Sequence, residues 1–167
     1  MKRVLLIKFA LKLIFICVLC MSFLSSCTIS LKNQDYAEVN LNEIKRLQLT
    51  YKQNIYDTEL QFSRSVLTLT FGTNETAFDG MNFKVTPDSC QVSMSGLNYS
   101  FNTSELPENY LPVTVYEFFY GFNETIVTEN YDSEQQCCYV SRSVGDSFVR
   151  FEVYEHNENT SYTLVIT

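Results

Sequence analysis

Apolar and polar residues alternate along residues 65–101, and this alternation predicts four consecutive strands. The apolar sets are Leu67, Leu69 and Phe71, then Met81, Phe83 and Val85, then Cys90, Val92 and Met94, and finally Leu97, Tyr99 and Phe101. Because successive side chains of a strand point to opposite faces, each strand has one apolar and one polar side. We therefore expect an antiparallel meander with a single apolar face that another element must cover.

The same alternation extends the predicted sheet in both directions along the chain. One strand is expected before the meander and three after it, over residues 56–62, 138–143, 147–154 and 161–167. The last two are expected to form a simple hairpin. Asn40 and Glu43 have the spacing of a helix N-terminus, which predicts a short helix there. The alternation of Leu47, Leu49 and Tyr51 suits a strand equally well, so the end of this helix stays open.

Residues 111–122 form the most apolar stretch after the N-terminal region, and we favour a helix here. One helical face would carry Leu111, Val115, Phe118, Phe119 and Phe122. Pro112 suits a first helical turn and Gly121 suits a helix end. A strand competes, because Tyr116, Phe118, Tyr120 and Phe122 also alternate. A helix here would be the cover that the apolar face of the meander requires.

The N-terminus has the organisation of a signal peptide. Residues 1–12 carry four cations, and residues 13–24 form an uncharged apolar run of the length expected for a signal-peptide core. The following Leu24-Ser25-Ser26-Cys27 resembles the bacterial lipobox, which implies cleavage before Cys27 and acylation of its sulfur. We expect a signal peptide over 1–26, a lipid-anchored tether over 27–34 and one domain over 35–167. An ordinary secreted protein cut near Ser26 and an uncleaved N-terminal anchor are the alternatives.

Composition and charge narrow the function classes. The chain has thirteen Phe and eleven Tyr, which indicates a folded, β-rich body rather than a disordered one. All nineteen acidic residues follow the leader, whereas four of the twelve cations lie within it, so the mature part has a net charge of −11. Such a surface repels phosphate backbones and anionic headgroups. We therefore expect no nucleic-acid partner, and any membrane association would come through Cys27.

Residues that could carry catalysis or hold a metal are scarce. His156 is the single histidine and is predicted to lie in a polar turn, so neither a catalytic triad nor a zinc site is favoured. We expect no enzyme activity, no cofactor and no metal. The acidic residues at 129–134 lack the spacing of a calcium loop and are expected to form a solvated loop. Five Asn-x-Ser/Thr sequons occur, at Asn74, Asn98, Asn102, Asn123 and Asn159.

The cysteines leave a structural question open. Acylation of Cys27 would leave Cys90, Cys137 and Cys138 in the mature chain, an odd number. On an alternating strand, Cys137 and Cys138 point to opposite faces. One of them could form a disulfide with Cys90, and the other would remain buried or reduced.

The run LTLTFGTNETAFDGMNFKVTPDSCQVSMSGLNYSFNTSELPENYLP, which begins at Leu67, resembles small lipoproteins of anaerobic, clostridial-type Gram-positive bacteria. These proteins share strands ending in an aromatic residue, "D-G" and "K/S-G-L" turns, and an acidic linker with "LP" before an apolar helix. They are similar in outline to the lipoprotein carriers of the LolA and LppX type, and the resemblance covers roughly residues 56–166. This chain departs from the pattern at Asn74-Glu75-Thr76, where a Ser/Pro pair is usual, and at Thr167, where related chains continue into another strand.

The resemblance implies an α+β fold in which a curved antiparallel sheet, a half-barrel, wraps around one or two helices. It implies an extracytoplasmic lipoprotein, anchored to the outer face of the cell membrane, that binds or carries a lipid or other apolar ligand. The residues expected to line such a site are Phe83, Val85, Met94, Tyr99, Phe118, Phe119 and Phe122. A closed core without a cavity is the competing interpretation. The alternative function is a secreted or surface glycoprotein that acts as an interaction module and is stapled by disulfides.

Overall fold

The computed structural model describes residues 36–72, 78–122, 124–156 and 159–167. The chain divides into two units, residues 1–33 and 34–167, and the described residues all belong to the second. The predicted signal peptide, the tether and Cys27 lie outside the described residues, as do the sequons at Asn74 and Asn123.

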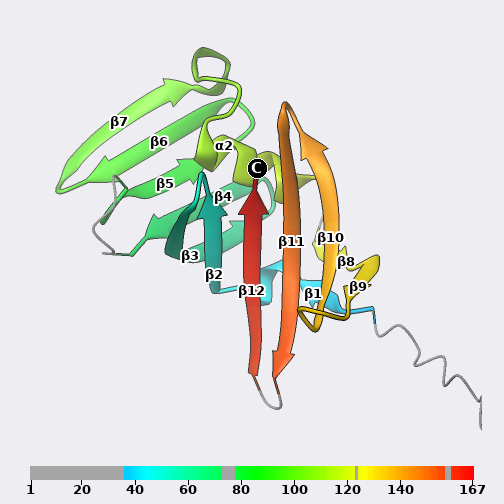
Figure 1. Ribbon diagram of the computed structural model, residues 1–167. Helices are drawn as coiled ribbons and strands as arrows, with labels where there is room; N and C mark the ends of the chain where they lie inside the picture. The colour runs from blue at the N-terminus through cyan, green and yellow to red at the C-terminus, as the bar shows by residue number, and fades with distance from the viewer. Residues whose placement is uncertain (1–35, 73–77, 123, 157–158) are drawn as a thin grey trace, which may run out of the picture. The chain divides into compact units, whose positions relative to one another are not determined.

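Ten strands of the second unit form one open sheet (Figure 1). Its order is β7-β6-β5-β4-β3-β2-β12-β11-β10-β9, so β7 and β9 are its edges. The strands are β2 (Arg46–Tyr51), β3 (Asn54–Ser63), β4 (Val66–Phe71), β5 (Asn82–Val85), β6 (Ser89–Met94), β7 (Leu97–Asn102), β9 (Asn130–Asp132), β10 (Cys137–Val144), β11 (Ser147–His156) and β12 (Asn159–Ile166). The four-strand meander and the final hairpin expected from the sequence are therefore confirmed.

The sheet is mixed, which corrects the expectation of a purely antiparallel sheet. All neighbouring strands are antiparallel except β12 and β2, which pair in parallel from Thr163↔Gln48 to Ile166↔Tyr51. This pairing joins two antiparallel blocks, β2 to β7 and β9 to β12, that are each built from sequential neighbours. Alternation along single strands carries no information about the direction of a partner this distant in sequence, so the parallel pair could not be predicted.

The region before β2 differs from the short helix that the sequence favours. Strand β1 (Glu38–Asn40) is followed by a single 3₁₀ turn, η1 (Leu41–Glu43). The Asn40 side chain accepts a hydrogen bond from the Asn42 backbone N–H at 2.9 Å, so the capping signal was correct. The 3₁₀ turn does not extend into a longer helix, because strand β2 already begins at Arg46. Strand β1 pairs with β8 (Thr125–Val127) in a small separate sheet.

Every second residue of the large sheet faces the core, and we call this side the inner face. In register, Leu60 lies opposite Leu69, Leu69 opposite Phe83, and Phe151 opposite Leu164. All five side chains are buried, as are Val39 of β1, Leu41 of η1 and Ile126 of β8, which join the same hydrophobic cluster. Burial of this single continuous apolar face is the main source of stability for the fold.

Helix α2 (Leu111–Tyr120) packs on the inner face against β4, β5 and β10, and it confirms the helical prediction for this stretch. Pro112 lies in its first turn. Phe118 and Phe119 are fully buried, and their ring centroids lie 6.5 and 5.8 Å from that of Phe151 in β11. These aromatic contacts fix the helix to the block of the sheet formed by β9 to β12.

Arg142 closes the C-terminal end of α2 from the inner face of β10. Its guanidinium lies over the rings of Phe118 and Phe122, with Cζ 4.7 and 4.1 Å from the ring centroids. Arg142 Nη2 also donates a hydrogen bond to the Glu117 carbonyl at 3.2 Å. A cation at a helix C-terminus is favoured by the helix dipole, so one arginine serves both as a lid on the aromatic rings and as a cap. Burial lowers the pKa of Arg142.

Gly121 is expected to be required by this arrangement. Its backbone is ordinary, with φ −74° and ψ −5°, but a Cβ atom there would lie 2.9 Å from Arg142 Cζ. We expect Gly121→Ala to lower the free energy of unfolding by about 1–2 kcal/mol, as overpacking does, measured by urea denaturation. In an Arg142→Ala background the same change should be neutral or slightly stabilising. An equal cost in both backgrounds would contradict this role of Gly121.

Candidate functional site

The predicted ligand-lining residues separate into three groups in the structure. Phe83 and Val85 are fully buried in β5. A contiguous cluster at the end of α2 consists of Phe118, Phe119 and Phe122. The ring centroid of Phe118 lies 5.3 Å from that of Phe119 and 5.2 Å from that of Phe122. Met94 and Tyr99 are exposed by 39% and 57%, so they do not belong to the helix–sheet interface. That interface is packed with aromatic rings, and its residues form a core.

The inner face continues beyond this core onto β6 and β7, where it is open to solvent. Register places Val92 opposite Tyr99, and Met94 opposite Leu97, on the same side of the sheet as the buried Phe83. We call the five apolar residues of this side the β6–β7 strip: Val92, Met94, Leu97, Tyr99 and Phe101. Val92 is partly buried, and the others are exposed by 39%, 55%, 57% and 41%. Figure 1 shows the β6–β7 hairpin extending away from α2 at this end of the sheet.

The strip is held rigidly by its turns and its outer face. Ser95 and Gly96 both have positive φ, 50° and 81°, which is the geometry of a tight two-residue hairpin. On the outer face, Ser93 Oγ donates to Asn98 Oδ1 at 2.6 Å. At the far end of β7, Thr103 Oγ1 donates to the Pro87 carbonyl at 2.7 Å. The exposed apolar residues therefore lie on an ordered strand and not on a loose terminus.

The cysteines do not form the disulfide considered from the sequence. Cys90 and Cys137 are both buried and unbridged, and their strands, β6 and β10, lie near opposite ends of the sheet. Burial raises the pKa of the Cys90 thiol to about 11. Register confirms that Cys137 and Cys138 point to opposite faces, because Cys138 pairs with the inner-face residue Val153.

Cys137 belongs to a polar cluster on the outer face of β9, β10 and β11. At its centre, Arg150 makes ion pairs of 3.0 Å with Asp132 and 2.8 Å with the buried Glu152. Arg150 also lies over the Tyr139 ring, 3.9 Å from its centroid, and 3.8 Å from Cys137 Sγ. Burial raises the pKa of Cys137 despite the adjacent guanidinium. The thiol is thus kept protonated, which suits a structural role better than a reactive one.

The acidic stretch at 129–134 is not simply the solvated loop expected from the sequence, because Asn130–Asp132 form edge strand β9, and Asp132 holds the turn that follows. Its Oδ1 accepts backbone hydrogen bonds from Glu134 and Gln135 at 3.0 and 3.1 Å. The hydrogen bond from Gln135, followed by that from Arg150, lowers the pKa of Asp132. Among the described residues no group of His, Cys, Asp and Glu side chains is arranged to hold a metal ion. The backbone of His156 ends strand β11 and pairs with Asn159, so it does not lie in the expected turn.

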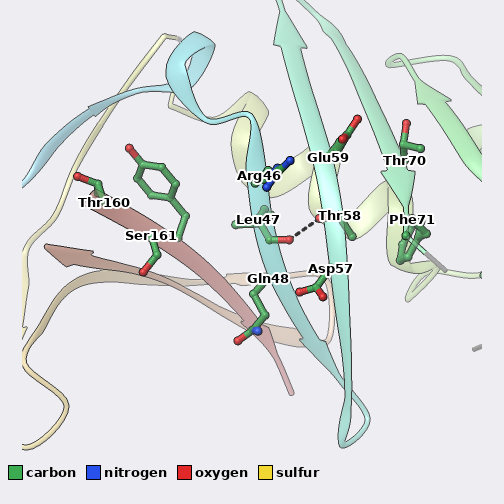
Figure 2. A pocket seen from close by; sticks show the side chains of 12 residues that line it. Arg46, Leu47, Gln48, Asp57, Thr58, Glu59, Thr70, Phe71, Thr160 and Ser161 are labelled. Atoms are coloured by element: carbon green, nitrogen blue, oxygen red, sulfur yellow. Dashed lines mark hydrogen bonds between the residues drawn. The ribbon is translucent and has the colours of Figure 1, made fainter. Parts of the chain in front are cut away.

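A hollow of about 760 Å³ opens where β12 diverges from β2 (Figure 2). Parallel pairing begins only at Thr163, so residues 160–162 run away from β2 and leave a wedge beside Arg46 and Gln48. At its edge, Thr58 Oγ1 donates to the Leu47 carbonyl at 2.7 Å. The hollow is lined by Arg46, Leu47, Gln48, Asp57, Thr58, Glu59, Thr70, Phe71, Gly72, Thr160, Ser161 and Tyr162. The hollow is wide open and its ionic side chains, Arg46, Asp57 and Glu59, are exposed, so it lacks the convergent buried polar groups of a specific small-molecule site.

Comparison of the chain with protein-family models, with curated proteins and with solved structures found no match. Within the part of the chain that the structure describes, no helix is long and apolar enough to cross a membrane. The site must therefore be judged on its geometry, and the β6–β7 strip is the feature that packing of the fold does not explain.

Sequence reasoning identified the alternation of β6 and β7 but assigned it to the covered face. The sequence contained one signal that this hairpin differs from the rest of the sheet. Residues 89–102, SCQVSMSGLNYSFN, contain no charged residue. Sequence reasoning also missed Arg142, although Cys138, Val140, Arg142 and Val144 share one alternation phase, which placed the arginine on the inner face.

Thiol labelling should report this arrangement. In the folded protein at pH 8, Cys90 should react with N-ethylmaleimide at least a hundredfold more slowly than a thiol of ordinary pKa, about 8.5, because its pKa is near 11 and it is fully buried. Cys137 should be similarly protected, and the half-buried Cys138 should be labelled before both. Peptide mass spectrometry, with urea-unfolded protein as the control, measures the three rates. A peptide that links Cys90 to Cys137 or Cys138 through a disulfide would contradict the arrangement.

Proposed function

We propose that this protein is a membrane-anchored extracytoplasmic lipoprotein that binds an apolar ligand on the β6–β7 strip. The observation that carries the proposal is that the exposed side chains of Leu97, Tyr99 and Phe101 lie on one face of a single ordered strand, next to the exposed Met94 of β6. Isolated exposed apolar residues need no explanation, whereas a contiguous apolar patch of this kind is typical of a binding surface.

The packing of the core favours an open site over an enclosed cavity. Phe118 and Phe119 pack against Phe151 and fill the space between α2 and this part of the sheet. A ligand would instead lie on the sheet, with one side against the strip. An acyl chain or an apolar peptide segment has this shape, and no ionic group is needed to hold either, since residues 89–102 carry none.

Anchoring rests on the leader sequence. A cationic segment, an apolar run and Leu24-Ser25-Ser26-Cys27 support cleavage and acylation, and two or three acyl chains hold a protein stably on a membrane. The likeness to half-barrel carriers is supported only in outline, by a ten-stranded sheet with a helix on its inner face.

The intact mass of the mature protein tests the anchor. We expect the loss of residues 1–26 and the added mass of a diacylglyceryl group on Cys27, measured by mass spectrometry of protein extracted from membranes. A Cys27→Ala variant, which removes the acyl acceptor, should remain in the uncleaved form. Heterogeneous hexose additions at Asn98, Asn102 or Asn159 would instead support the alternative, a secreted or surface glycoprotein.

Binding of a fluorescent long-chain fatty acid tests the ligand site in a protein that begins at Gln34, the start of the compact unit. We expect Leu97→Lys combined with Tyr99→Lys to weaken binding about tenfold or more, because each tenfold step corresponds to about 1.4 kcal/mol of lost apolar contact. Ile55→Lys is the matched control, since Ile55 is as exposed as Tyr99, at 57%, but lies on β3. Equal weakening by the control would contradict the proposed site.

A further inference from the structure

The two edges of the ten-stranded sheet are protected very differently. Edge strand β9 has three residues, and its Asp132 is held in an ion pair with Arg150. Edge strand β7 has six residues, Leu97–Asn102, with no charge, no proline and a regular register along its whole length. Natural sheets normally shield a long edge with charges, proline, bulges or a covering segment, because its unpaired backbone otherwise attracts another strand. Strand β7 has none of the first three.

The tight turn at Ser95-Gly96 determines which backbone groups this edge presents. In a two-residue hairpin the residues that flank the turn, here Met94 and Leu97, form a hydrogen-bonded pair. Alternation then directs the N–H and C=O groups of Leu97, Tyr99 and Phe101 toward β6. Those of Asn98 and Ser100 are directed outward, where they can pair with a further strand.

We infer that the β7 edge pairs with the β7 edge of a second copy of this chain, and that the apolar binding site is completed by both copies. This inference rests on the proposed function, because it names the partner at that same site. The pairing is antiparallel about a two-fold axis perpendicular to the sheet and centred on Tyr99, so the two sheets continue as one with their inner faces on the same side.

The residues of β7 are complementary to themselves in this register. Leu97 lies opposite Phe101 of the other copy, Tyr99 lies opposite its own equivalent, and both pairs are apolar and on the inner face. Asn98 lies opposite Ser100, which puts polar residues together on the outer face and matches the outward-directed backbone groups. A register shifted by one residue would set Leu97 opposite Ser100 or Asn102 and lose this match.

Charge also favours a second copy at this edge. Each mature chain carries a net charge of −11, so most approaches of two copies are repulsive. Residues 89–102 are uncharged, so the β6–β7 edge is where two acidic copies meet with the least repulsion. Anchoring of both chains to one membrane raises their effective concentration further.

Pairing doubles the apolar surface that a ligand can contact. In one copy the β6–β7 strip ends at the sheet edge, and a ligand placed there would have solvent on one side. Across the two-fold axis, Leu97, Tyr99 and Phe101 continue directly into the same three residues of the other copy. The result is one apolar surface of ten strip residues, five from each copy, with the hydrophobic core and helix α2 of one copy at each end.

Disulfide trapping of the full chain in its native membranes tests the pairing. Directly opposed residues that do not exchange hydrogen bonds have Cα atoms about 4.5 Å apart, within the range of about 4.4–6.8 Å that a disulfide requires. Tyr99→Cys should therefore give, with copper phenanthroline as oxidant, a reducible species of twice the mass of the mature chain. Ile55→Cys has the same exposure and the same native thiols, and it should give only background.

A second substitution excludes chance collisions. Ser100→Pro removes an outward N–H that has no partner among the described residues, so the fold should persist while the Tyr99→Cys crosslink falls at least fivefold. No more crosslinking from Tyr99→Cys than from Ile55→Cys would overturn the inference. If fatty-acid binding nevertheless depends on Leu97 and Tyr99, the proposed site survives with a different partner. A crosslink without fatty-acid binding would retain the pairing and overturn the ligand.

Discussion

The constraint on which this structure depends is that one helix must cover the apolar face of ten strands. Strands spaced about 4.8 Å apart give a sheet about 43 Å wide, whereas a ten-residue helix is about 15 Å long and about 10 Å thick. Helix α2 contacts β4, β5 and β10, and β1, η1 and β8 add apolar side chains to the same cluster. The β6–β7 end receives no comparable cover, and the exposed strip follows from that shortage.

The parallel pairing of β2 and β12 determines where the core lies. It joins the β2–β7 block to the β9–β12 block. Helix α2 packs against β4 and β5 of the first block and against Phe151 and Arg142 of the second, so it contacts both. The same pairing is short, and β12 diverges from β2 before Thr163, where the hollow opens. One pairing thus explains both the compact centre and this hollow.

The charged groups that the fold buries are placed to hold its elements together and not to react. Arg142 ties β10 to the end of α2, and Arg150 ties β9 to β11 through Asp132 and Glu152. Both guanidiniums lie over aromatic rings, which replace part of their hydration. The half of the sheet with these polar anchors ends in a protected edge, whereas the uncharged half ends in the open one.

Sequence alone determined the four-strand meander, strands β3 and β10 to β12, their phase and the covering helix, because alternation and helical spacing are local patterns that a buried face imposes on neighbouring residues. It also located the apolar positions of β7. Only the tertiary structure decided that β2 and β12 run in parallel, that Cys90 lies far from Cys137, and that Leu97, Tyr99 and Phe101 stay exposed. These outcomes depend on which distant strands meet and on how far a short helix reaches. A local pattern marks a residue as apolar, and the extent of the cover decides whether that residue becomes core or surface.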